Sequence, residues 1–493
     1  MPTSLPSSPT FDEGVDPPLD VLADRVQTVL EDASPDAERV VRVSVPVGPD
    51  VDPIQWIRAQ EADDVVYWSS RTPGASTSGR ANGSDREAVA LAAVGSADVI
   101  TSTRNPLDYD RFRRRLRDRF AAADGPIRYV GGLRFDAPQP ASARRPDDLW
   151  RPFGTCRFVL PRFELVGRAG ERELACNLVL PRDAARAGAL RERIRALTFS
   201  SPSPPNGALP RPSRRTDRPD REGWTRMIRW ALSAIDDGRL DKVVFARRVS
   251  LALDSGVDPL RVLRHLKATT PGCFHFALRP PSGPAFIGAS PERLFRRDGA
   301  RVLSEAVAGT RERGDTEEAD AALREELLTS AKERREHAFV QRAIERALST
   351  VCDSVEGAER PSELALARGR HLHAPIEGTL RADASTVDLL EALHPTPAVG
   401  GVPTDAALGA IREQEPFDRG WYAGPVGWIG PEAAEFAVAI RSGLLGPSSL
   451  SLFSGAGIVD GSVPDREWAE IEQKIGDFAA VLGLLGQTDG ARR

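Results

Sequence analysis

The chain has 493 residues, of which 41% are hydrophobic and 28% are charged, so it can bury a sizeable core and has the composition of a globular protein. Its net charge of −5 excludes the global positive field that attracts nucleic acid or anionic membranes. The four cysteines form no C-x-x-C pair, which argues against a zinc site or a disulfide framework and favours a reducing compartment. The sequence contains neither a secretory signal nor an apolar run near the roughly 20 residues that cross a membrane, so we expect a soluble cytoplasmic protein.

Composition divides the chain into four parts. Residues 1–18 are rich in proline, serine and aspartate and are expected to form a disordered tail, while a Pro/Ser-rich, charged stretch over 201–221 is expected to be a linker. Residues 19–200, before the linker, alternate short β-type runs with polar turns, and residues 222–486 follow it. A mobile loop is expected over 72–79.

The predicted strands and helices cluster instead of alternating strictly, which favours an α+β fold over a doubly wound sheet. Apolar alternation predicts strands at 40–47, 64–69, 127–135, 156–165, 173–180, 241–252, 273–279, 285–288, 301–304, 425–429, 435–442 and 450–454. Helical periodicity predicts helices at 111–122, 182–197, 221–237 and 316–351, and from 465 to about 485.

The helix at 111–122 carries a run of arginines that is a candidate stripe for binding nucleic acid. However, Phe112, Leu116 and Phe120 recur every four residues along it. We therefore interpret it as an amphipathic helix with a solvated basic face, and expect no nucleic-acid partner.

Lysine is scarce in this arginine-rich chain, in which it occurs only as Lys242, Lys267, Lys332 and Lys474. Lys242 stands at the start of the apolar β-type run 243–246. A lysine at such a place can lose its proton when it is desolvated, which an arginine cannot do, so Lys242 is a candidate general base. An ordinary lysine on an edge strand is the alternative.

Two stretches that follow hold further candidate groups. Glu292 comes after an apolar strand and Pro291, where partial burial can raise its pKa and make it a proton donor. A capping glutamate is the alternative. Thr310, in the sequence Ala308-Gly309-Thr310, offers a hydroxyl beside a close backbone approach and is a weak signal by itself.

Glutamates occur in pairs at i, i+3 spacing on two predicted helices, as Glu333 with Glu336 and Glu467 with Glu470. Paired carboxylates on two helices suit a hard ion such as Mg²⁺ that keeps positions open for an anionic substrate. Surface salt bridges produce the same spacing and are the alternative for either helix alone.

Three residues near the C-terminus predict a pocket for a small ligand that carries a carboxylate. Arg441 ends an apolar strand, and Gly457 lies in a glycine turn whose N–H groups can face an anion. Tyr422 is close to them in sequence. The glycine turn is too short to be a dinucleotide fingerprint.

Ten motifs resemble the chorismate-utilising enzymes, most closely the isochorismate synthases, and occur in the order DKVVFAR, GASPERL, EAVAGTRERG, KERREH, RHLHAPIEG, LHPTPAVGGVP, FDRGWYAGPVGW, FAVAIR, GAGIV and EWAEIEQK. They lie within residues 222–486, and YVGGLRFD and LPRFEL extend the likeness upstream. The resemblance implies an α+β fold like that of anthranilate synthase component I, with two antiparallel sheets packed face to face and helices outside. One departure is Arg370, where glutamine is common in the family.

The resemblance also implies a Mg²⁺-dependent conversion of chorismate to isochorismate. In that reaction Lys242 would activate water for attack at C2, and Glu292 would protonate the departing C4 hydroxyl. Further implied roles are Mg²⁺ binding by Glu336 and Glu470 with Glu333 and Glu467 as nearer or water-mediated partners, binding of the enolpyruvyl carboxylate by Tyr422, Arg441 and Gly457, and lining of the ring by His371 and Thr310.

Relatives that use ammonia lack a lysine base at this position and resemble PAGTxSGAPK where this chain has PTPAVGGVP over 395–403. Water is therefore the expected nucleophile, and no glutaminase subunit is expected as a partner. By resemblance, the protein is expected to act as a monomer and to serve menaquinone biosynthesis. A siderophore pathway, and a salicylate synthase that goes on to eliminate pyruvate, are the alternatives.

Overall fold

The computed structural model describes residues 18–60, 62–71, 89–104, 106–136, 148–168, 170–199, 212–366 and 369–481. The helices in these ranges are α1 (Pro18–Glu31), α2 (Pro53–Ala59), α3 (Tyr109–Ala121), α4 (Ala187–Arg195), α5 (Arg221–Asp236), α6 (Pro259–Thr269), α7 (Glu317–Thr329), α8 (Ala331–Ser349), α9 (Thr386–Leu393), α10 (Thr404–Gln414) and α11 (Pro464–Val481). The strands of the first half are β1 (Arg39–Val47), β2 (Val65–Ser69), β3 (Val89–Ser102), β4 (Ala123–Asp124), β5 (Tyr129–Leu133), β6 (Cys156–Arg168) and β7 (Glu171–Leu180). The remaining strands are β8 (Pro212–Arg218), β9 (Lys242–Leu253), β10 (Phe274–Arg279), β11 (Ala285–Ser290), β12 (Arg293–Asp298), β13 (Arg301–Glu312), β14 (Cys352–Gly357), β15 (Ser362–Ala365), β16 (Gly369–Leu380), β17 (Gly401–Val402), β18 (Pro425–Ile429), β19 (Ala433–Val438), β20 (Ser442–Leu445) and β21 (Ser449–Ile458).

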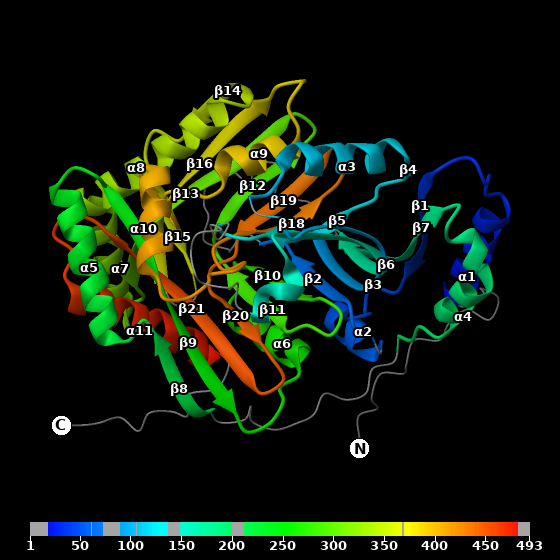
Figure 1. Cartoon of the computed structure of the whole chain (residues 1–493), viewed down its shortest axis with the longest axis horizontal. Coiled ribbons are helices and arrows are strands. Elements are labelled where there is room, and N and C mark those ends of the chain that lie inside the picture. The colour runs from blue at the N-terminus through cyan, green and yellow to red at the C-terminus, as the bar shows by residue number, and fades with distance from the viewer. Residues whose placement is uncertain are drawn as a thin grey trace, which may run out of the picture.

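Two sheets meet at the long strand β6. One edge of β6 pairs with β3, and its other edge pairs with β5 and, further along, with β7. From β5 the first sheet continues through β18, β19, β12, β13 and β16, and from β3 the second continues through β2, β10, β11, β20, β21, β9 and β8. The two sheets diverge across Figure 1, with β13 and β16 in the upper sheet and β9 and β21 in the lower one. Among the described strands, every pairing is antiparallel except that of β1 with β4.

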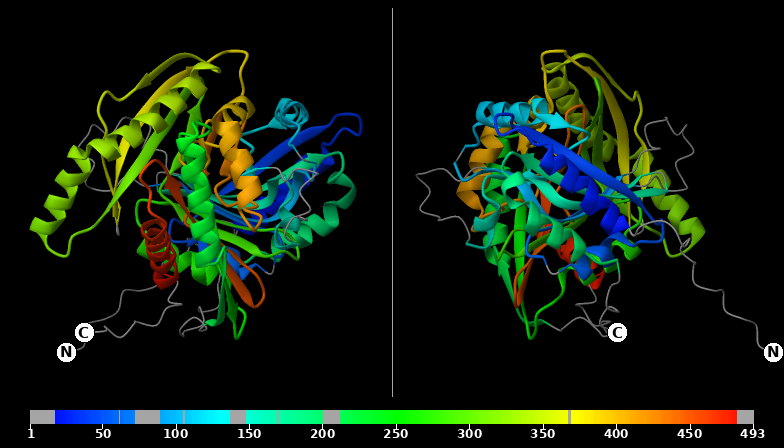
Figure 2. Two further views of the ribbon diagram at one scale, coloured as in Figure 1. Left: turned by 60° about the vertical axis from the view of Figure 1, so that its left-hand side comes forward. Right: turned by 90° about the vertical axis from the view of Figure 1, so that its right-hand side faces the viewer.

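The two halves of the chain share both sheets. β5 pairs with β18 in one sheet, and β2 pairs with β10 in the other. The helices pack on the outer faces, as α8 does on β13, β14 and β16. In both views of Figure 2 the layer made by α7, α8 and these strands stands at one side of the molecule. The predicted α+β fold with two antiparallel sheets and flanking helices is confirmed.

An aromatic core packs on β11 and β21 of the second sheet and includes Tyr422 of the candidate site. The ring centroid of Trp150 lies 5.2 Å from that of Phe286 and 5.8 Å from that of Phe453. Phe453 in turn stacks on Tyr422, with 5.2 Å between the ring centroids and 18° between the ring planes. Because such contacts are rigid, the core fixes the ring of Tyr422.

Part of the predicted linker over 201–221 belongs to the fold. Residues 212–218 form β8, which pairs with β9, and α5 begins at Arg221. The side chains of β8 are mostly exposed, and Arg215 pairs with Asp217 on the same strand and with Glu472 on α11. Charged side chains are usual on an edge strand, so its composition resembles that of a linker.

The predicted helical region over 316–351 is two helices, because the chain turns at Ser330. The Ser330 hydroxyl caps α8 by accepting a hydrogen bond from the Glu333 N–H at 3.3 Å. The tail predicted over 1–18 lies outside the described residues except for its last residue, and the loop predicted over 72–79 lies outside them altogether. In the described part of the chain, no helix has the length and apolar character needed to cross a membrane.

Candidate active site

Lys242 begins β9 and is brought to a carboxylate far along the chain. The apolar run 243–246, with two valines and a phenylalanine, places this strand in the core, and the lysine itself is only 7% exposed. Its Nζ donates a hydrogen bond to Glu336 Oε1 on α8 at 2.9 Å. The sheet and α8 together therefore hold a lysine and a glutamate at one point.

Gly457 lies next to the Lys242–Glu336 pair. It lies on β21, which pairs with β9 so that Gly457 stands opposite Val244. A Cβ atom at residue 457 would lie 3.0 Å from Lys242 Cε, 3.4 Å from Lys242 Nζ and 3.6 Å from Glu336 Oε1. Gly457 therefore gives the lysine the room that it occupies.

We expect Gly457→Ala to displace Lys242 and to lower kcat at least tenfold, because small misplacements of a catalytic group cost up to roughly 100-fold in rate. Steady-state kinetics of the purified variant would measure the loss. Gly188→Ala is the matched control, since a Cβ at residue 188 in α4 meets nothing within 4 Å. Equal activity of wild type and Gly457→Ala would show that the Lys242 side chain can move aside for the added methyl group without loss of function.

Glu292 lies in the turn between β11 and β12 and is 7% exposed. Its N–H donates to Ser290 Oγ at 3.2 Å, and its C=O accepts from the Val438 N–H at 3.1 Å. Burial raises the pKa of Glu292 to about 8, against a smaller lowering by the charge of Lys242, and the charge of Glu305 adds to the rise. Glu292 is therefore a protonated carboxylic acid at neutral pH, and it lies within electrostatic reach of Lys242.

Tyr422 and His371 both lie within electrostatic reach of Arg441, and Tyr422 also lies within reach of Glu292. Burial raises the pKa of Tyr422 to about 12, so its hydroxyl stays neutral. Burial lowers the pKa of His371 to about 4, with the charge of Arg441 as the next cause, so the ring is neutral as well. The Nδ1 atom of His371 lies 3.2 Å from the carbonyl oxygen of Gly309. A carbonyl oxygen only accepts hydrogen bonds, so Nδ1 must carry the proton of the neutral ring. His371 Nε2 is then an acceptor.

Arg441 acts on both of these groups electrostatically and has an unusual backbone. Its φ of 49° is in the left-handed region, and its C=O accepts from the Ala289 N–H at 3.1 Å. Such a conformation is costly for an arginine and is typical of functional sites. Thr310 stands opposite His371 in the β13–β16 ladder, but its side chain lies outside what the structure describes.

The four glutamates predicted to hold Mg²⁺ approach from two helices. Glu336 pairs with Lys242, and Glu333 Oε1 accepts from Arg311 at 3.0 Å. On α11, Glu470 Oε1 accepts from Lys474 at 2.5 Å, and Glu467 lies one turn earlier.

Oxygen donors of this kind have the chemistry that Mg²⁺ requires. No three acidic, histidine or cysteine side chains in the described ranges lie close enough together to hold a metal ion. The magnesium site therefore stays a prediction.

Arg370, the departure from the family pattern, points toward β15 and α7. It is 1% exposed, and its Nη1 donates to Glu363 on β15 at 2.8 Å. It also pairs with Asp320 on α7, and this contact holds the pKa of Asp320 below its usual value. Neighbouring residues of a strand face opposite sides, so Arg370 fastens α7 to β16 while His371 faces the site.

Sequence reasoning did not single out the buried ion pair that supports β9. Arg419 donates to the Val244 C=O at 2.7 Å and pairs with Glu415, whose Oε1 accepts from the Ala246 N–H at 2.7 Å. The pair therefore fixes the backbone just after Lys242. The motif FDRGWYAGPVGW contains Arg419, but nothing in it signals a contact with β9.

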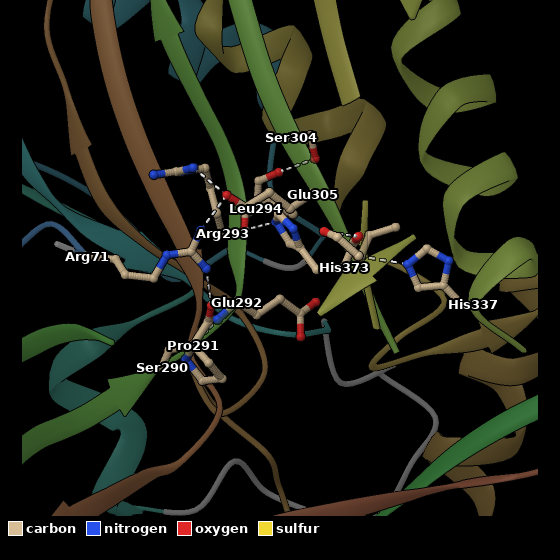
Figure 3. A network of polar contacts seen from close by, with 12 residues as sticks. Arg71, Ser290, Pro291, Glu292, Arg293, Leu294, Ser304, Glu305, His337 and His373 are labelled. Carbon is tan, nitrogen blue, oxygen red and sulfur yellow. Dashed lines mark hydrogen bonds and ion pairs between the residues drawn. The ribbon is translucent and has the colours of Figure 1, made fainter. Parts of the chain in front are cut away.

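A second network lies behind Glu292 and was also missed. It consists of Arg71, Arg293, Glu305 and His373 (Figure 3). Glu305 and His373 stand in the motifs EAVAGTRERG and RHLHAPIEG, so their strand positions were available from the sequence. Arg71 comes from the N-terminal half and carries no local signal of this role.

The site thus combines a lysine, a protonated glutamic acid, a neutral histidine and an arginine between two antiparallel sheets. The chain belongs to the chorismate binding enzyme family, whose sequence profile matches residues 26–483.

The chloroplastic isochorismate synthase of Catharanthus roseus is 34% identical over 491 residues, covering 92% of this chain and 83% of that protein. The salicylate biosynthesis isochorismate synthase of Pseudomonas aeruginosa is 37% identical, covering 75% of this chain and 77% of that protein. The solved structure of MenF, the menaquinone-specific isochorismate synthase of Escherichia coli, has a TM-score of 0.80 and 29% identity and covers 94% of this chain and 100% of that one.

Proposed function

We propose that this protein is an isochorismate synthase, which converts chorismate to isochorismate by adding water at C2 and expelling the C4 hydroxyl. The observation that carries the proposal is that one site holds Lys242, the candidate base, whose Nζ lies 2.9 Å from Glu336 Oε1, and Glu292, which burial keeps protonated as a candidate acid. The similarity to isochorismate synthases over most of their length supports it.

In the proposed reaction Lys242 takes a proton from water as the new C2–O bond forms. Glu292 gives its proton to the C4 oxygen as the C4–O bond breaks, so that one water enters and one leaves. Arg441, Tyr422 and the Gly457 backbone would bind the enolpyruvyl carboxylate, and His371 and Thr310 would line the ring. Each carboxylate of the substrate needs such a partner, because an unpaired charge in a buried site costs several kcal/mol.

Mg²⁺ is part of the proposal, with Glu336 and Glu470 as its ligands and Glu333 and Glu467 as nearer or water-mediated partners. When bound, it would neutralise the ring carboxylate of chorismate. If Glu336 bound Mg²⁺, its carboxylate would no longer be available for the ion pair with Lys242. The lysine would then be released for its role as base.

Chorismate is the proposed substrate, with no glutaminase or nucleic-acid partner, and the protein is proposed to act as a monomer in the cytoplasm. The four cysteines are all free and buried, which is consistent with a reducing compartment. Menaquinone biosynthesis is the pathway that we propose, on the likeness to MenF.

The test is product analysis by chromatography after the purified protein has been incubated with chorismate. We expect isochorismate with Mg²⁺ present, and almost none after EDTA treatment until Mg²⁺ is restored. Salicylate and pyruvate among the products would make the protein a salicylate synthase instead. Chorismate that reacted only when ammonia was added would contradict the proposal.

A further inference from the structure

A second buried carboxylate, Glu305 on β13, lies behind Glu292. It is 4% exposed, and its Oε1 accepts from Arg71 Nη2 at 2.6 Å and also pairs with Arg293. Its Oε2 lies 3.4 Å from His373 Nε2. Figure 3 shows this network on one side of Glu292, whose own carboxyl group points away from the arginines.

The two arginines are held where they are by other contacts. Their guanidinium groups lie over the ring of Phe274, at 5.6 Å for Arg71 and 5.5 Å for Arg293. Arg71 Nη1 also donates to the Pro291 C=O at 2.8 Å, on the residue just before the acid. The network is therefore attached to the backbone that carries Glu292.

The environments of the two carboxyl groups push their pKa values apart. Burial acts to raise the pKa of Glu305, but Arg71 and Arg293 outweigh it and hold that pKa well below its usual range. At Glu292, burial and the charge of Glu305 outweigh the lowering by the charge of Lys242 and raise the pKa to about 8. Such a split between neighbouring groups commonly separates a proton donor from a group that stays ionised.

Several charged or titratable groups face Glu292 from the elements around it. Lys242 on β9 favours its ionised form, and Glu305 on β13 opposes it. Tyr422, before β18, is close enough for the charge of Glu292 to raise the pKa of its hydroxyl. Without Glu305, the lysine and the arginines behind the acid would all favour loss of its proton.

We propose that Glu305 is a positioning residue for Glu292. The fixed negative charge of Glu305 keeps Glu292 in the proton-donating form, and Arg71 links the two by contacting both Glu305 and the Pro291 C=O. The inference deepens the proposed function and rests on it for the role of Glu292 as the acid. It gives the N-terminal half of the chain, through Arg71, a part in the chemistry of the C-terminal half.

Glu305→Gln is the first test, because it removes the negative charge and leaves both arginines in place. The alkaline limb of the kcat profile is expected to move to lower pH by roughly one unit or more, as is usual when a nearby charge is removed. Arg71→Met should move the same limb to higher pH, since it leaves the charge of Glu305 less compensated. Opposite shifts cannot come from general loss of stability, and Arg71→Met remains informative if Glu305→Gln does not fold.

The control is Glu164→Gln, because Glu164 is also buried and paired, with Arg42 Nε at 2.6 Å, but lies on β6 far from the site. This variant should leave the alkaline limb in place. Glu305→Asp keeps the charge and should restore the limb toward its wild-type position. A lower kcat in Glu305→Gln with an unmoved limb would overturn the proposal and leave Glu305 a packing residue.

Infrared titration separates this inference from the proposed function, because it needs no substrate. The protonated carboxyl band that is lost in Glu292→Gln should disappear near pH 8 in the wild-type protein and at lower pH in Glu305→Gln. The same titration in both proteins would overturn the inference even if isochorismate is made. A shifted titration in a protein that does not convert chorismate would uphold the role of Glu305 and reject the proposed function.

Discussion

Replacing Lys242 by alanine is expected to lower kcat for isochorismate formation by roughly 10² to 10⁴-fold, the usual contribution of a general base. The physical reason is that Lys242 begins β9 beside Gly457, whereas Lys267 on α6 donates to the Tyr67 hydroxyl and Lys474 on α11 is paired with Glu470. The measurement is the initial rate of isochorismate formation with saturating Mg²⁺. Binding of chorismate should weaken far less than kcat falls, because the substrate is held mainly by other groups.

Two further variants distinguish a base from a charge. Lys242→Arg keeps a cation beside Glu336 but cannot give up its proton, so it should be as inactive as Lys242→Ala. Lys267→Ala should retain wild-type activity, because Lys267 is on α6 and donates to the Tyr67 hydroxyl at 2.9 Å, away from the site. Substantial activity in Lys242→Arg would mean that the lysine acts only through its charge.

The candidate site could be predicted from the sequence wherever a residue stands in a recognisable motif on a regular element. Lys242, Glu292 and Tyr422 are all buried, and Glu292 lies within electrostatic reach of the other two, while their roles stay predictions. The contacts that tune them could not be predicted, because they join residues that are far apart in the sequence. Arg71 is 220 residues from Pro291, and nothing local in either stretch indicates that the two residues meet.

The fold shows the same division between local and long-range information. β18 was predicted with the same limits that it has in the structure, because its apolar run has clear ends. β3 was not predicted, although it is the longest strand described, because it is buried on both faces in places and lacks a clean alternation. The antiparallel pairing of β14 with β16 was also missed, since the side chains of β14 are largely polar and exposed.

The pH dependence of the reaction is expected to follow Glu292. Its pKa of about 8 means that the acid is protonated and active below that pH, and kcat should fall as the pH rises above it. Glu292→Gln cannot donate a proton and should lose roughly 10² to 10⁴-fold in kcat at every pH. A wild-type profile that stays flat well above pH 9 would show that another group is the acid.

Glu292→Gln should lower activity but should raise the stability of the folded protein relative to wild type as the pH rises. In the unfolded chain Glu292 ionises near its ordinary pKa of 4.5, whereas in the folded protein it keeps its proton until about pH 8. Between these values the unfolded state binds fewer protons, so the free energy of unfolding falls as pH rises. Glutamine has no proton to lose, so the melting temperature of Glu292→Gln relative to wild type should rise from pH 5 to pH 8 and then level off. Glu359→Gln, at an exposed residue, should show no such trend, and a difference that did not change with pH would mean that Glu292 is already ionised in the folded protein.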